Sequence, residues 1–125
     1  MIKTISTDKA PAAIGPYSQA KVVGNLVFTS GQIAINPANG EIEAVTIEEQ
    51  TKQVCENIKN LLEASGSDLQ SVVKTTCFLK NMEDFATFNA IYAEYFTGKP
   101  ARSCVAAKQL PKDVLVEVET IAVVK

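Results

Sequence analysis

An amphipathic helix flanked by β-rich segments is the feature that most constrains the fold. Thr46 offers an N-cap, and Glu49 three residues later completes a capping box that satisfies two free backbone donors. The helix is predicted to run from there to about Ser65, where Gly66 ends it. Apolar residues recur along it at helical spacing, while Lys and Glu occupy the opposite side. One face of this helix must therefore be buried.

Segments rich in Val, Ile and Thr predict strands on both sides of this helix. Residues 1–5, 17–23 and 26–30 read as strands before it, and residues 72–79 form the next strand after it. The second and third are separated by Gly24-Asn25 only. Two such residues favour the positive φ angles of a tight hairpin turn, so these two strands are predicted to pair.

A second helix is predicted from Asn81, as its N-cap, to about Thr97, with Gly98 and Pro100 ending it. Asn89 falls beside its aromatic stripe, where an amide must find a partner or cost a few kcal/mol. An amide that faces a ligand would meet this requirement. The stripe itself is predicted to pack in the core and comprises Phe85, Phe88, Tyr92, Tyr95 and Phe96.

The segment Pro100–Val124 carries the residues best suited to chemistry. It reads as two strands joined by a turn that contains Pro and Asp. Arg102 and Cys104 share a face of the first strand, and Glu117 and Glu119 share a face of the second. We expect these strands to be neighbours, which would bring a guanidinium, a thiol and two carboxylates together in a chain without histidine.

The resulting order, β-β-β-α-β-α-β-β, predicts one α+β domain spanning residues 1–125. Both helices lie in strand-helix-strand crossovers, which place them on the same side of a single sheet. Residues on the open side are too apolar for a solvent face and too charged for a sealed core. We therefore expect a homo-oligomer with polar pockets at the subunit seams.

Composition excludes several classes of function. The net charge of -2 and pI near 5.1 leave no basic surface for nucleic acid or an anionic membrane. Cys55, Cys77 and Cys104 cannot all pair within one chain, and none has metal-ligand spacing, so we expect a reducing compartment and no bound metal. No apolar run has the length of a signal peptide core or a membrane span, which makes a cytoplasmic location the expectation.

Four sequence blocks, in this order, resemble one known family. They are IGPYSQA at 14–20, TSGQI at 29–33, VVKTTCFL at 72–79 and PARSCVAAKQLPKDVLVEVE at 100–119. Together they resemble the RidA or YjgF-type proteins, the 2-iminobutanoate/2-iminopropanoate deaminases, over nearly the whole chain. The resemblance implies a chorismate-mutase-like fold that assembles as a homotrimer, with three clefts between subunits and no cofactor. The segment 97–99 is shorter than in some members, which affects the cleft rim.

The resemblance also implies an activity and residue roles. Family members hydrolyse reactive enamines and imines to 2-oxo acids and ammonia. By position, Arg102 would hold the substrate carboxylate and Glu117 would handle the water. The residues implied to line the same cleft are Tyr17, Ser30, Gly31, Asn89 and Cys104.

This chemistry is reasonable for these side chains. Arginine binds a carboxylate through two parallel hydrogen bonds, and one carboxylate can act first as base and then as acid. Alternation alone does not distinguish Glu117 from Glu119, and the resemblance selects Glu117. Purely structural roles are the alternative for two of these residues: Cys104 can be a small buried hydrophobe, and Tyr17 can be a packing residue.

Two other functions compete with imine hydrolysis. A regulatory module that binds a small carboxylate without turnover would need Arg102 but hardly Glu117. A ribonuclease is disfavoured by the acidic pI, the absence of histidine and the lack of a basic groove lined by aromatic residues.

Overall fold

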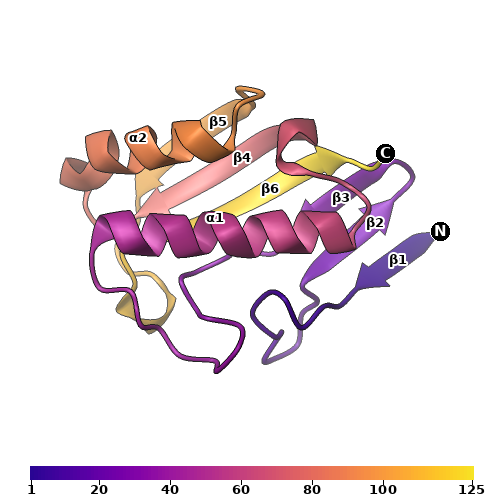
Figure 1. The fold of residues 1–125 in the computed structure, drawn as a ribbon, viewed down its shortest axis with the longest axis horizontal. Helices are drawn as coiled ribbons and strands as arrows, with labels where there is room; N and C mark the ends of the chain where they lie inside the picture. Colours follow the sequence, from indigo (N-terminus) through magenta and orange to yellow (C-terminus); the bar gives the residue numbers. More distant parts are fainter.

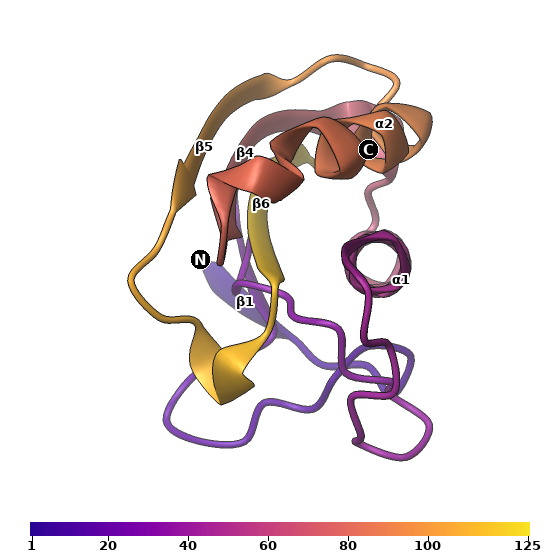
Figure 2. The same cartoon turned by 90° about the vertical axis from the view of Figure 1, so that its left-hand side faces the viewer.

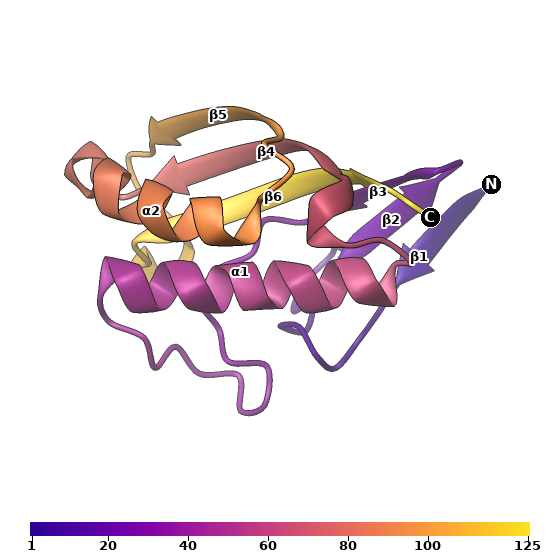
Figure 3. The ribbon, with the colours of Figure 1, turned by 45° about the horizontal axis from the view of Figure 1, so that its top comes forward.

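A six-stranded mixed sheet carries two helices on one face in the computed structural model, which describes residues 1–125 (Figure 1). The helices are α1 (Ile47–Ala64) and α2 (Phe85–Tyr95). The strands are β1 (Ile2–Ile5), β2 (Ala20–Val23), β3 (Leu26–Thr29), β4 (Val72–Leu79), β5 (Ala101–Ala106) and β6 (Val116–Val123). Their order in the sheet is β1-β2-β3-β6-β4-β5, and only β4 and β5 pair in parallel (Figure 3). The predicted element order and the single sheet are confirmed.

The helix α1 begins and ends where its local signals predict. The Glu49 amide donates to Thr46 Oγ1 at 3.1 Å, and Glu49 Oε1 accepts from the Thr46 amide at 3.3 Å, so the capping box is confirmed. Gly66, with φ +82°, follows the last turn in the left-handed conformation that glycine favours. Both of these signals depend only on neighbouring residues, which explains their success.

The predicted start of α2 is wrong. Asn81 is extended and makes no capping hydrogen bond, and a 3-10 turn over Met82–Asp84 precedes the helix at Phe85. The cause is a bond from the Asp84 amide to the Asn81 carbonyl at 3.1 Å, which tightens this turn before regular helix begins.

The core lies between the helices and the inner face of the sheet, defined here as the face that carries Thr75, Val118 and Thr120 (Figure 2). The aromatic stripe of α2 is in it as predicted, with Phe88, Tyr92 and Phe96 buried. The rings of Tyr92 and Phe96 stack with 4.4 Å between centroids. Neither helix is long and apolar enough to cross a membrane.

The outer face of the sheet is mixed in character. No helix covers it (Figure 2), and Phe28 and Val105 are 41% and 50% exposed on it. Glu117 and Glu119 share this face with Ile121. The expected mixture of apolar and charged residues is present, whereas the homo-oligomer inferred from it stays a prediction.

The expectation that β5 and β6 are neighbours is wrong. β4 lies between them and pairs with both. Each end of the connection from β5 to β6 bonds to the end of β4, through Ala107 N to Leu79 O at 2.9 Å and Lys80 N to Leu115 O at 3.0 Å. The connection therefore passes over the end of β4 and does not close a hairpin.

Candidate functional site

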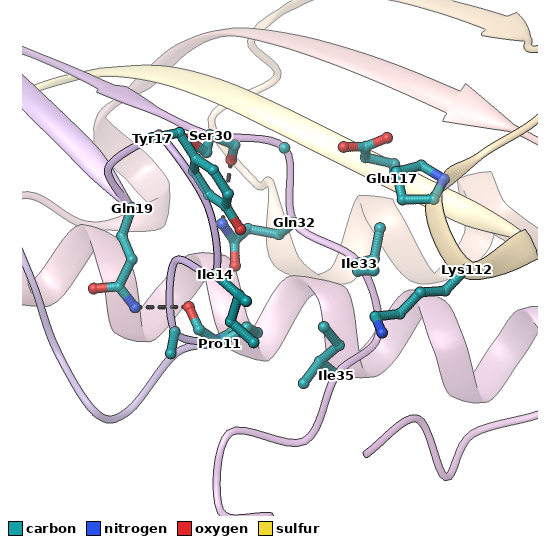
Figure 4. A pocket seen from close by; sticks show the side chains of 13 residues that line it. Pro11, Ile14, Tyr17, Gln19, Ser30, Gln32, Ile33, Ile35, Lys112 and Glu117 are labelled. Atoms are coloured by element: carbon teal, nitrogen blue, oxygen red, sulfur yellow. Dashed lines mark hydrogen bonds between the residues drawn. The ribbon is translucent and has the colours of Figure 1, made fainter. Parts of the chain in front are cut away.

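Four of the residues singled out in the sequence meet in one cavity of about 570 Å³, called here the Glu117 pocket (Figure 4). Tyr17 comes from the loop before β2, Ser30 and Gly31 follow β3, and Glu117 lies near the start of β6. The remaining wall is largely apolar and is formed mainly by Pro11, Ile14, Ile33, Ile35 and Pro111. Lys112 is the only cationic residue on the lining.

Glu117 is a partly buried carboxylate without a partner. It forms no hydrogen bond and no ion pair within the chain. Burial, together with the like charge of Glu119, raises the pKa of the Glu117 carboxyl above its ordinary value. A carboxyl whose pKa moves toward neutrality can both accept and return a proton, so it is suited to acid-base chemistry.

Gly31 allows the Glu117 side chain to occupy this position. A Cβ added at Gly31 would lie 2.9 Å from Glu117 Cδ and 3.1 Å from Cγ, and closer still to Oε2. The group that approaches within the chain is the Glu117 carboxylate.

Buried amides hold the walls of the pocket in place. Gln19 Nε2 donates to Pro11 O at 2.7 Å and Ser30 Oγ donates to Ser18 O at 2.6 Å, which ties the loop before β2 to the end of β3. From α1, Asn57 Nδ2 donates to Ile33 O and Ile35 O at 3.1 and 2.9 Å.

The sequence did not predict these buried polar contacts. Gln50 and Asn57 are buried on α1, and Gln50 Oε1 accepts from Leu115 N at 2.9 Å, just before β6. Gln53 Nε2 donates to Asn57 Oδ1 at 2.9 Å. The signal was available, since polar residues at 50, 53 and 57 lie at helical spacing and interrupt an otherwise apolar face.

Arg102 and Asn89 lie in a second cavity, of about 580 Å³, called here the Arg102 hollow. Arg102 Nη1 donates to Asn89 Oδ1 at 2.6 Å, which identifies the partner of this amide. The guanidinium lies 4.9 Å from the ring centroid of Tyr92 and 5.3 Å from that of Phe85. The Tyr92 hydroxyl is itself hydrogen-bonded to Thr75 Oγ1 at 2.7 Å. Two aromatic faces and an amide therefore fix the guanidinium before any anion arrives.

The two cavities lie on opposite faces of the sheet. Arg102 pairs with Thr75, which is buried under α2, so Arg102 belongs to the inner face. Glu117 pairs with Phe78, whose side chain points to the outer face. The expectation that adjacent strands bring the Arg102 guanidinium and the Glu117 carboxylate together is therefore wrong within one chain. Their partners on β4, Thr75 and Phe78, are three residues apart and so face opposite sides of the sheet.

Cys104 lines neither cavity. It lies opposite Cys77 on the inner face and packs against the core. Burial raises the pKa of its thiol, although the charge of Arg102 opposes this shift. The thiol is therefore a poor nucleophile. No group of three acidic, histidine or cysteine side chains is arranged to hold a metal ion.

Known proteins match this chain over almost its full length. The family model described as Endoribonuclease L-PSP matches residues 7–124. The 2-iminobutanoate/2-iminopropanoate deaminase of Escherichia coli is 50% identical over 127 residues, covering 98% of both chains. A RutC family protein of Pyrococcus abyssi is 55% identical over 121 residues, covering 96% of this chain and 95% of its own. The crystal structure of E. coli TdcF with bound serine gives a TM-score of 0.93 at 42% identity, covering 98% and 99%.

Proposed function

This chain belongs to the Endoribonuclease L-PSP family, also known as YjgF/RidA, and we propose that it hydrolyses 2-imino acids such as 2-iminobutanoate and 2-iminopropanoate to 2-oxo acids and ammonia. Relatives named for this activity support the reaction. The observation that carries the proposal is that each chain holds two complementary parts of a site in separate cavities. One part is the unpartnered Glu117 carboxylate, whose pKa is raised, and the other is the fixed Arg102 guanidinium, which has no carboxylate beside it.

The working site is proposed to form between subunits of a homotrimer. Glu117 of one copy would face Arg102 of the next, since no single chain brings them to the same side of its sheet. The contact would be heterologous, with two different surfaces meeting, and a closed ring of three copies would contain three such sites. The exposed apolar residues of the outer face, Phe28 and Val105, supply surface for this contact.

The proposed reaction uses these two groups in sequence. Arg102 binds the substrate carboxylate through donors that Asn89 does not occupy, which fixes the neighbouring C2. Glu117 accepts a proton from water as the water oxygen bonds to C2 of the protonated imine. Glu117 then returns that proton to the nitrogen and accepts the proton of the new hydroxyl group as the C2–N bond breaks, so that ammonia leaves with a 2-oxo acid. The departing ammonia takes up the proton that Glu117 now holds, which restores the carboxylate. General acid-base help of this kind contributes about 10² to 10⁴ in rate.

A complementation assay tests both the reaction and the position of the site. Threonine dehydratase with threonine supplies 2-iminobutanoate, and semicarbazide traps the remaining imine. Arg102→Ala and Glu117→Gln should each lose the acceleration. When the two variants are unfolded and reassembled together, about a quarter of the seams should combine one intact Arg102 with one intact Glu117.

The matched control is the double variant, which should restore nothing with either single variant. Recovery near a quarter of wild-type activity supports a site shared between copies. Co-assembled mixtures that stay inactive refute the shared site, and a wild-type protein that does not accelerate formation of 2-oxobutanoate refutes the reaction.

A second candidate function is a binding module that holds a small carboxylate without turnover. The serine bound in E. coli TdcF favours it, as does the ready-made Arg102 hollow. The two functions separate at Glu117→Gln, which abolishes turnover in an enzyme but leaves the affinity for 2-oxobutanoate unchanged in a binding module. Ribonuclease activity, suggested by the family description, finds no support in a chain of net charge -2.

A cytoplasmic location is also proposed. It is supported by three free cysteines, two of which are buried in the core.

A further inference from the structure

The Arg102 hollow contains a second cation that the proposed reaction does not use. Lys99 lines the hollow together with Arg102 and Asn89, and no acidic side chain lies on the lining. Lys99 forms no ion pair with any carboxylate of the chain. The hollow therefore presents two positive charges and no negative one to whatever enters it.

The backbone holds Lys99 at the rim of this hollow. Its φ of +53° is left-handed, a conformation that non-glycine residues seldom adopt, and its amide donates to Phe96 O at 3.2 Å. The preceding Gly98 packs tightly, since an added Cβ would lie 3.0 Å from Gln70 O. Thr97 Oγ1 accepts from Gln70 Nε2 at 3.5 Å. The turn that carries Lys99 is thus anchored to the 3-10 turn at Leu69–Ser71.

We propose that Lys99 is a specificity-determining residue that selects 2-imino acids with a second carboxylate. This inference rests on the proposed function, in which Arg102 takes the carboxylate next to the imine. A 2-imino dicarboxylate then places its distal carboxylate beside the remaining cation of the hollow, Lys99. The reaction is the same: water adds to C2, the C2–N bond breaks, and the products are a 2-oxo dicarboxylate and ammonia.

The size of the effect follows from the exposure of Lys99. An ion pair at an exposed lysine contributes up to about fivefold in affinity, and salt screens it. A ligand with one carboxylate gains less than twofold in affinity from Lys99, because Arg102 already holds that group. The preference for dicarboxylates should therefore shrink at high ionic strength.

Binding and turnover are measured on the same set of variants. Lys99→Asn removes the charge and tolerates the left-handed backbone, Lys99→Arg keeps the charge, and Lys52→Gln is a control on the exposed side of α1 outside both cavities. Calorimetry compares 2-oxoglutarate with 2-oxobutanoate. Turnover compares iminosuccinate, made from aspartate by an aspartate oxidase with catalase present, with 2-iminobutanoate.

Lys99→Asn should weaken 2-oxoglutarate binding and lower kcat/KM for iminosuccinate about fivefold, with less than twofold change for the monocarboxylates. Lys99→Arg should keep the wild-type affinity for 2-oxoglutarate and the wild-type kcat/KM for iminosuccinate, and Lys52→Gln should change neither. Equal losses for mono- and dicarboxylates, or no loss for either, overturn the assignment. Absence of turnover with every imine would instead refute the proposed function, and the calorimetric comparison would still decide the role of Lys99.

Discussion

Gly31→Ala tests the proposed chemistry with the smallest possible change. The added methyl group would lie 2.9 Å from Glu117 Cδ and nearer to Oε2, whereas ordinary contacts between carbon atoms are about 3.5 to 4.0 Å. The carboxylate must therefore move by roughly an ångström. A displacement of that size costs about a hundredfold in rate when the group takes part in the reaction. We expect kcat/KM for 2-iminobutanoate to fall by about that factor.

The fold should survive this substitution. Gly31 is not left-handed, so alanine fits its backbone, and the loss of chain entropy in the unfolded state contributes roughly 0.4 to 1 kcal/mol in favour of folding. Gly24→Ala is the matched control. Gly24 has φ +59° and no atom within 4 Å of an added Cβ, so this variant should lose stability while its activity stays intact.

A double-mutant cycle shows whether Gly31→Ala acts through Glu117. If it does, Gly31→Ala should cost much less in a Glu117→Asp background, because the shorter side chain draws the carboxylate away from the added methyl group. Wild-type turnover in Gly31→Ala, or losses that multiply in the double variant, would refute the reasoning. Semicarbazide trapping gives the rates, and thermal unfolding followed by circular dichroism gives the stabilities.

Three further predictions concern groups around the two cavities. Because Glu119 helps to raise the pKa of Glu117, Glu119→Gln should move the acid limb of the kcat/KM profile to lower pH, and an unmoved limb would contradict this. Asn89→Ala removes the hydrogen bond that orients Arg102, so KM should rise about tenfold with kcat nearly unchanged; an equal fall in kcat would place Asn89 in the chemical step. Asn57→Ala leaves two carbonyls without their donor, so we expect a loss of about 2 kcal/mol by urea unfolding, and a loss below about 0.5 kcal/mol would show that water replaces the amide.

The features predicted best from the sequence are those that depend only on residues close together in the chain. The capping box of α1 and the hairpin at Gly24-Asn25 need only a few residues, and both are present as expected. The predicted start of α2 was wrong because a 3-10 turn over Met82–Asp84 separates Asn81 from the helix, and neither Asn81 nor Asp84 makes a side-chain capping hydrogen bond.

The arrangement of the site was harder to predict, because it depends on strand order. Alternation places Arg102 on one face of β5 and Glu117 on one face of β6, but it does not relate two strands that do not touch. That relation is fixed by β4, through Thr75 opposite Arg102 and Phe78 opposite Glu117. Apart from Cys104, the residues that the family resemblance selected line the two cavities, but the resemblance did not reveal that they belong to opposite faces.

The separation of Arg102 from Glu117 has a chemical consequence for the proposed reaction. Had the two residues been adjacent in one chain, the guanidinium would stabilise the carboxylate and lower the pKa of Glu117, leaving a weak base and an occupied anion site. In the folded chain, Arg102 donates a hydrogen bond to the neutral amide of Asn89, and burial raises the pKa of Glu117. Each group is thereby kept available for a substrate. A site assembled from two copies can use both, provided that the substrate carboxylate occupies Arg102 before Glu117 reaches it.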